Sequence, residues 1–457
     1  MPGLDTVIRA ERAIIGDTER PAAVGISGGR VEHVTDIRDA LAAEREVHLD
    51  AKHVLMPGLV DTHVHLQDPG HADWEGFDTG SRAAARGGIT CLVDMPLDSL
   101  PVTVDVAALE AKRGAAAGRV FVDVGFWGGL VPGNVAELEP LHRAGALGAK
   151  CFLADTGLAE FPPVSVAELR TALRALREFD GLLLVHAEDC ASLAGVPAQA
   201  GRSYQRYLGA RPARIEETAV AAVIDAVRNT GGRAHIVHVS SASSAELLAR
   251  ARQEGLPVTA ETCPHYLTLS AEDVPDGATS FKAAPPIRDG ANREALWRHV
   301  AAGTLGLIVS DHSPSAIEHK ILDTGDFDTA LGGISSLQVA LPVVWTQARR
   351  RGHSLVDVAR WMSSRPAELA GLASKGAIAP GRDADLCVFA PDVSFVVDVA
   401  ALEHRQPISP YAGRELHGVV VQTWLHGRPI DLDAAPRGRL LTRAPVPARA
   451  TAPAPAG

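Results

Sequence analysis

Short apolar runs alternate with longer amphipathic segments between residues 58 and 374. The runs are rich in β-branched residues, which is typical of buried strands, whereas the segments between them, such as VAELRTALRALREF and REALWRHVAAGTL, repeat apolar residues at helical spacing. Eight runs can be counted, namely LVDTHVHL, ITCLVDMP, VFVDVGFW, LGAKCFLA, LLLVHAED, AHIVHVSS, PVTAETCPHY and LIVSDHSP. This α/β alternation predicts a (β/α)8 TIM barrel, a ring of parallel strands covered by helices.

The two ends of the chain show a different pattern. Residues 1–57 and 375–432 contain short alternating runs broken by turn residues, such as AVGISGGRVEHV and VVVQTWLHGRPI, which predict β-strands. We expect these segments to pair as one small β-sandwich domain beside the barrel of residues 58–374. Residues 433–457 are dominated by Pro, Ala and Arg and cannot bury much apolar surface, so we expect a disordered tail there.

Composition and charge exclude several classes of protein. No apolar run approaches the roughly 20 residues that span a bilayer, and no basic region followed by an apolar stretch opens the chain. We therefore expect a cytoplasmic protein without a membrane partner. The net charge of -11, with no basic cluster, disfavours nucleic acid and favours a small-molecule substrate. The five cysteines show no C-x-x-C spacing, which predicts reduced thiols.

Candidate metal ligands lie at the ends of the predicted strands, where barrel enzymes carry their reacting groups. A lone histidine at a strand end is more often a hydrogen-bonded structural residue than a ligand. Here, however, four histidines, a lysine and an aspartate fall at the same end of five predicted strands, and the two histidines of the H-x-H motif face the same way. His235 faces away from His238 on one strand, so we assign it to packing or to support of a ligand. The predicted ligands are His63, His65, Lys150, His186, His238 and Asp311.

Lys150 needs a separate account, because an ammonium group repels a metal ion. A desolvated amine forms a Schiff base with a carbonyl substrate, or it reacts with CO₂ to give an anionic carbamate that bridges two ions. The surrounding imidazoles and carboxylate favour the carbamate. A structural salt bridge remains open as a third interpretation at this point.

Several motifs occur in the order found in the cyclic amidohydrolases, and the likeness covers nearly the whole chain. MPGLVDTHVHLQDPG, GAKCFLADTG, LLVHAE, ETCPHYL, VSDHSP and KGAIAPGRDADLCVF resemble that family. The resemblance implies ring-opening hydrolysis of a cyclic amide by two divalent ions. Zinc is the first choice for a site rich in histidine, and cobalt, manganese, nickel and iron are also compatible with imidazole and carboxylate ligands. The resemblance implies that His63, His65 and Asp311 hold one ion, that His186 and His238 hold the other, and that carboxylated Lys150 bridges them. It also implies that Asp311 is the catalytic acid and base, and that the chain forms a homotetramer. A catalytically inactive binding protein would lack some of these ligands.

The departures from the family pattern bear on the substrate. Dihydroorotases carry an Arg, two Asn and a His at the positions that here are Gln67, Leu97, Ala284 and Ser315. Without these anchors, the carboxylate of dihydroorotate would be desolvated without a partner. Hydantoinases and dihydropyrimidinases usually have a Tyr shortly after the bridging lysine, where this chain has Asp155.

These departures favour allantoin, a hydantoin ring with a ureido substituent that is degraded in purine catabolism. The alternative is that the chain hydrolyses the cyclic amide of a hydantoinase or dihydropyrimidinase substrate. The residues expected to contact the substrate, mainly through their backbone, are Ser313, Ala284, Gly332 and Gly333. The role of Asp98, at a position where the most similar family members more often have Asn, stays open.

Overall fold

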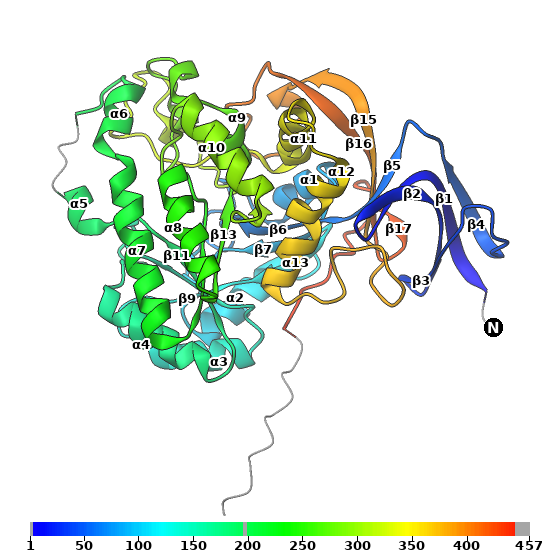
Figure 1. The fold of residues 1–457 in the computed structure, drawn as a ribbon, viewed down its shortest axis with the longest axis horizontal. Coiled ribbons are helices and arrows are strands. Elements are labelled where there is room, and N and C mark those ends of the chain that lie inside the picture. The colour runs from blue at the N-terminus through cyan, green and yellow to red at the C-terminus, as the bar shows by residue number, and fades with distance from the viewer. Residues whose placement is uncertain (1–2, 195–198, 444–457) are drawn as a thin grey trace, which may run out of the picture.

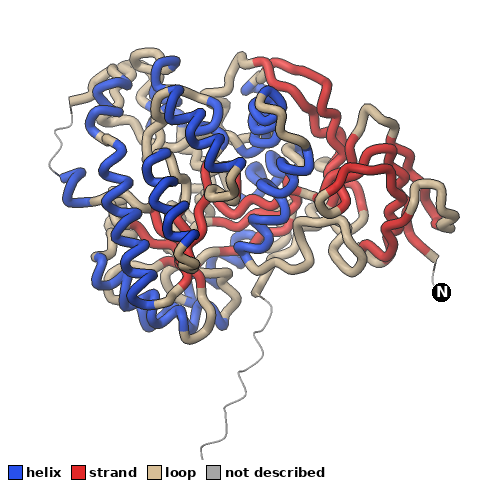
Figure 2. Tube along the Cα trace, viewed as in Figure 1, coloured by secondary structure: helices blue, strands red, loops and turns tan. Residues whose placement is uncertain are grey.

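The computed structural model describes residues 3–194 and 199–443. A helix-covered barrel occupies one side of the molecule, and a unit built of long strands projects from the other side (Figure 1). In Figure 2 the helices surround the short strands of the barrel, whereas strands make up most of the projecting unit. All five cysteines are free thiols. No helix in the described part of the chain combines the length and the apolar character of a membrane span.

The barrel strands run parallel to their neighbours and form two arcs, with the orders β6-β7-β8 and β14-β13-β12-β11-β10-β9. Trp127 connects the arcs, because its N–H donates to Asp94 of β7 while the next residue pairs with β10. On the other side, Val64 of β6 forms a parallel bridge with His312, which follows β14. The strands are β6 (Leu59–Val64), β7 (Ile89–Asp94), β8 (Asp123–Phe126), β9 (Gly128–Gly129), β10 (Ala149–Phe152), β11 (Leu182–His186), β12 (Arg233–Ile236), β13 (Val258–Thr262) and β14 (Leu307–Ile308). Each of the eight predicted runs contains one of these strands.

The helices cover the barrel with their apolar faces. Helix α4 illustrates the rule, because Ser165 and Glu168 form a capping box at its start and its leucines pack inward. The helices are α1 (Phe77–Arg86), α2 (Val106–Ala116), α3 (Leu138–Arg143), α4 (Val166–Arg177), α5 (Cys190–Ala194), α6 (Tyr204–Ala210), α7 (Ala213–Thr230), α8 (Ala242–Gln253), α9 (Pro264–Thr268), α10 (Gly290–Ala301), α11 (Ala340–Arg350), α12 (Leu355–Ala359) and α13 (Arg365–Ala370).

The two end segments of the chain form one sheet, as the sequence predicts. Its order is β17-β16-β15-β5-β1-β2-β3, and β4 pairs with β1. The antiparallel pair of β5 and β15, in which Met56 lies opposite Cys387, joins the N-terminal to the C-terminal segment. The strands are β1 (Leu4–Ile15), β2 (Thr18–Ser27), β3 (Arg30–Thr35), β4 (Ala43–Leu49), β5 (Val54–Pro57), β15 (Leu386–Val396), β16 (Glu415–Leu425) and β17 (Arg428–Pro429).

A buried ion network joins this sheet to the barrel. The Lys375 ammonium lies 2.5 Å from Asp123, at the start of β8, and 2.6 Å from Asp385, just before β15. His426, which follows β16, lies 2.9 Å from the same Asp123 carboxylate. The network therefore ties together segments that are far apart in the sequence.

The expectation of disorder from residue 433 onward does not hold for residues 433–443. The N–H of Gly438 donates to Val120, and the N–H of Leu441 donates to Val124 of β8. These backbone hydrogen bonds attach the segment to the barrel, although its composition offers little apolar surface. Residues 444–457 lie outside the described part of the chain.

Candidate metal centre

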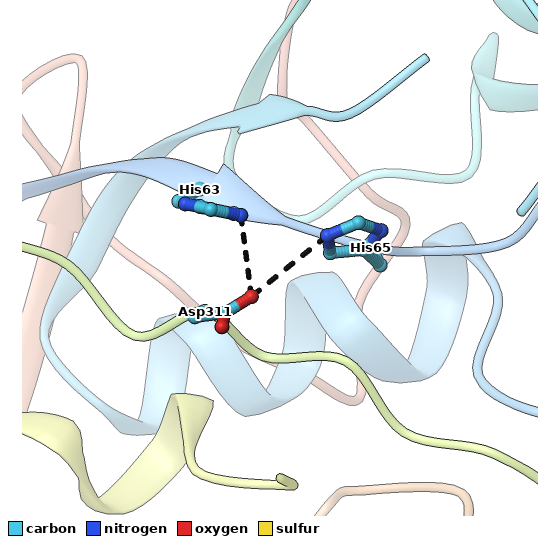
Figure 3. A group of neighbouring side chains, drawn as sticks. All are labelled: His63, His65 and Asp311. Carbon is cyan, nitrogen blue, oxygen red and sulfur yellow. Dashed lines mark ion pairs between the residues drawn. The ribbon is translucent and has the colours of Figure 1, made fainter. Parts of the chain in front are cut away.

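His63, His65 and Asp311 converge at the carboxyl ends of the barrel strands (Figure 3). Nε2 of His63 lies 3.2 Å from Oδ1 of Asp311, and Nε2 of His65 lies 3.8 Å from the same oxygen. One ligand atom from each residue lies within 4.8 Å of the other two. The H-x-H spacing thus brings both imidazoles to one carboxylate, as the alternation of a strand predicts.

His186 and His238 form a second convergent pair. Nδ1 of His186 lies 2.9 Å from Nε2 of His238, and the two rings meet edge to face. The centroid of the His238 ring is 5.4 Å from that of His63, so the two groups of ligands are neighbours. All four imidazoles are buried.

Lys150 is completely buried, and its amine has no hydrogen-bond partner among the described residues. No carboxylate oxygen in the described part of the chain lies within 4.0 Å of it, which argues against the interpretation as a structural salt bridge. Burial lowers the pKa of Lys150 to about 8, although Asp311 and Glu261 oppose the shift. A pKa of about 8 leaves roughly a tenth of the amine neutral at pH 7, far more than for an exposed lysine.

Three carboxylates contact the imidazoles at the ring nitrogen that points away from the cluster. Nδ1 of His63 lies 2.5 Å from Glu261, and Nε2 of His186 lies 3.0 Å from Glu188. The third carboxylate, Asp98, lies 2.8 Å from Nδ1 of His65. Each of these histidines thus has one nitrogen held by a carboxylate and the other directed at the common centre, an arrangement typical of metal-binding histidines.

Sequence reasoning missed the roles of these carboxylates. The spacing of Glu188, two residues after His186, was a usable signal, whereas Glu261 is 198 positions away from His63. Glu261 also lies 2.9 Å from His235, so His235 supports a ligand through this carboxylate, in agreement with its expected orientation away from the centre. Burial lowers the pKa of His265, another histidine in the wall of the same cavity, to about 4.

The donor set fits divalent transition metals. Imidazole nitrogens and carboxylate oxygens are the usual ligands of zinc, cobalt, manganese and iron, and none of the four imidazoles is directed into solvent. Burial lowers the pKa of His63, His186 and His238, which keeps these rings in the neutral form that binds metals.

A cavity of about 450 Å³ opens onto this cluster. The four residues expected to contact a substrate, Ser313, Ala284, Gly332 and Gly333, all line it. Gln67, Leu97 and Ser315, which depart from the dihydroorotase pattern, lie in the same wall.

Two cations in the cavity wall were not foreseen from the sequence. Arg211 is paired with Glu188 at 2.7 Å. Lys282 donates a 2.5 Å hydrogen bond to the carbonyl of Ala330. Neither residue stands in a motif that links it to the metal ligands, so only the fold brings them to the cavity.

A parallel barrel with this cluster at its strand ends defines a metal-dependent hydrolase, and residues 54–430 match the Amidohydrolase family. The chain belongs to this family. It is 50% identical to the allantoinase of Streptomyces avermitilis over 448 residues, which are 97% of this chain and 100% of the relative. The allantoinase of Saccharomyces cerevisiae is 43% identical, with 83% of each chain covered.

Solved structures of related enzymes share the fold. The L-hydantoinase (dihydropyrimidinase) of Arthrobacter aurescens superimposes with a TM-score of 0.89 at 29% identity, and the match covers 96% of this chain and 100% of that one. The dihydropyrimidinase of Brevibacillus agri gives a TM-score of 0.87 at 28% identity, covering 97% and 100%. The predicted family and fold are therefore confirmed.

Proposed function

We propose that this chain opens the hydantoin ring of allantoin by hydrolysis and so produces allantoate. The observation that carries the proposal is the cluster of His63, His65 and Asp311 in a chain that is 50% identical over nearly its full length to an allantoinase. The hydantoinases share the fold at lower identity, which makes hydantoin or dihydropyrimidine hydrolysis the second candidate.

The residues divide into two ligand groups. His63, His65 and Asp311 would hold one ion. His186 would bind the second through Nδ1, because Glu188 faces its Nε2, and His238 would bind it through Nε2, which faces the same point. Zinc suits this histidine-rich set, and its identity as the physiological metal is part of the proposal.

Lys150 would bridge the two groups as a carbamate. Its neutral amine attacks CO₂: an N–C bond forms while the electron pair of one C=O π bond moves onto oxygen, and the proton released from nitrogen passes to solvent water, which leaves an anionic carbamate in place of the amine. The lowered pKa and the absence of a hydrogen-bond partner among the described residues both support this reaction.

Two divalent ions held by these residues would lower the pKa of bound water and polarise the carbonyl of the amide. Asp311 then serves as the acid and base of the chain. Its carboxylate accepts a proton from the attacking water and delivers it to the ring nitrogen when the C–N bond breaks. During this proton transfer, Glu261 holds the His63 ring in a fixed orientation and Asp98 holds the His65 ring.

A panel of substrates tests the proposal. Purified, metal-loaded protein is assayed with allantoin, hydantoin, dihydrouracil and dihydroorotate, and kcat/KM should be highest for allantoin. Dihydroorotate should be poorest, by about a thousandfold, because no cation occupies the four positions at which dihydroorotases bind its carboxylate. Faster turnover of hydantoin or dihydrouracil would favour the second candidate, and fastest turnover of dihydroorotate would contradict both.

Assembly belongs to the same proposal. We infer a homotetramer from the resemblance to the family, and light scattering of purified protein at micromolar concentration measures the assembly. The cytoplasmic location expected from the sequence stays a prediction.

A further inference from the structure

Residues 330–333 form part of the cavity wall, and two lysines from other segments bind their backbone. The amine of Lys282 donates to the carbonyl of Ala330 at 2.5 Å. The amine of Lys320 donates to the carbonyls of Leu331 and Gly333, at 3.2 and 2.6 Å. The N–H of Gly333 donates in turn to the carbonyl of Lys282, at 2.9 Å. This segment, which we call the wall loop, is therefore attached through both lysines.

The charge of these lysines is costly to bury. Lys320 is 2% exposed, and no carboxylate oxygen in the described part of the chain lies within 4.0 Å of either amine. Burial lowers the pKa of Lys320 to about 7 and that of Lys282 to about 8. A methionine of similar length would avoid this cost. Unlike methionine, both amines donate hydrogen bonds to the backbone of the wall loop.

Two further backbone hydrogen bonds hold the start of the wall loop: the N–H of Ala330 donates to Asp326 at 3.0 Å, and the N–H of Leu331 donates to His319 at 2.8 Å. The loop contains no helix and only an isolated bridge at its end, where Ile334 pairs with His312. Gly333 has a φ of 113°, and a Cβ there would lie 2.0 Å from the carbonyl oxygen of Ser313. Leu331 is 42% exposed and so adds little packing. Ala330 is buried, whereas Gly332 and Gly333 have no side chain, so the lysine hydrogen bonds to the carbonyls of residues 330, 331 and 333 are a large part of what fixes this path.

We propose that Lys282 and Lys320 are positioning residues that hold the wall loop in the conformation that binds substrate. They act on the substrate through the loop backbone and not on the reacting atoms. Loss of either amine therefore weakens substrate binding and leaves the metal centre intact. The expected change in KM rests on the proposed function, because allantoin is the substrate of the assay.

The test compares Lys282→Met and Lys320→Met with Lys52→Met, a matched control at an exposed lysine of the small sheet. The two loop variants should raise KM for allantoin about tenfold, keep kcat within about threefold and retain the metal content of the wild type. Lys282→Arg, which keeps a donor, should recover most of the binding. An unchanged KM, or a parallel loss of kcat and metal, would overturn the proposal.

Two further measurements keep the inference testable if Lys320→Met does not fold. Gly332→Ala adds a methyl group whose nearest neighbour outside the loop is 3.8 Å away, so it should fold normally and still raise KM. Hydrogen exchange of residues 330–333 should be faster in Lys282→Met than in Lys52→Met, and equal rates would contradict the role of Lys282. Exchange needs no substrate, so a wild type that fails to hydrolyse allantoin would refute the proposed function while this measurement still decides the positioning role.

Discussion

The carboxylate of Asp98 lies 2.8 Å from Nδ1 of His65, on the ring edge opposite the nitrogen that faces Asp311. This contact places the ring proton on Nδ1 and leaves the lone pair of Nε2 directed at the centre. Glu261 does the same for His63. In both rings the neighbouring carboxylate therefore leaves Nε2 as the nitrogen available to the predicted metal ion.

Replacement of Asp98 should distinguish its role in orienting the His65 ring from the effect of its negative charge. Asp98→Asn keeps an oxygen that accepts from His65, so we expect metal content near that of the wild type and a loss of kcat/KM below tenfold. Asp98→Ala removes the acceptor and should cost about 10- to 100-fold in metal affinity or activity. Elemental analysis and steady-state kinetics measure both. Full metal content and turnover in Asp98→Ala would show that the contact is dispensable.

Active protein should contain two divalent ions per chain. Two groups of ligands are present, and the first of them already brings three donor atoms within 4.8 Å of one another. Dialysis against a chelator should abolish turnover, and zinc or cobalt should restore it. Elemental analysis that repeatedly finds one ion or none in fully active protein would contradict the binuclear centre.

Lys150→Ala should lose both ions and nearly all turnover, because it removes the amine that would carry the bridging carbamate. Short carboxylic acids added to this variant should restore part of the activity, since they can replace the carbamate. Carbon NMR of wild-type protein equilibrated with labelled CO₂ should show a carbamate signal that Lys150→Ala lacks. Full activity of the variant would rule out the bridging role.

Asp311→Asn should fold but lose most of its turnover. An amide cannot accept the proton of the attacking water, and it is a poor metal ligand. Thermal unfolding should remain close to that of the wild type, because Asp311 lies at the cavity and not in the apolar core. If the variant retains its metal and turns over at nearly the normal rate, another group must be the base.

The sequence was sufficient for the barrel and for the convergence of His63, His65 and Asp311, because strand ends meet at one rim of a barrel whatever the loops do. It was not sufficient for partners set by long-range packing. Glu261 reaches His63 across 198 positions, and Lys282 reaches the cavity only through the path of its loop. The attachment of Leu441 to β8 was missed for the same reason, since backbone hydrogen bonds leave no trace in composition.

The ion network around Lys375 gives the last prediction, which concerns stability. The Lys375 ammonium is 2% exposed and contacts Asp123 and Asp385, whose side chains are 1% and 4% exposed. Lys375→Met leaves Asp385 buried without a cation and Asp123 with His426 as its remaining side-chain partner, and the free energy of unfolding should fall by about 3–5 kcal/mol at pH 7. Lys52→Met, at an exposed site, is the control.

The pH dependence of this loss follows from the direction of the shifts. Burial alone would lower the pKa of Lys375, but Asp385 and Asp123 raise it above its ordinary value, so its contribution is complete below about pH 10 and is lost only as pH rises through the folded-state pKa. Burial opposes the shift of Asp123, whose pKa is nevertheless lowered by His426 and Lys375, and its contribution is lost as pH falls below about 4. Burial raises the pKa of Asp385, and Lys375→Met removes the cation that opposes this shift, so the carboxylates of the variant protonate first as pH falls. Denaturant unfolding at pH 4, 5, 7 and 9 should therefore show the largest difference between wild type and Lys375→Met at pH 7 and 9 and smaller differences at pH 5 and 4. Equal stabilities at pH 7 would mean that the network does not hold the sheet to the barrel.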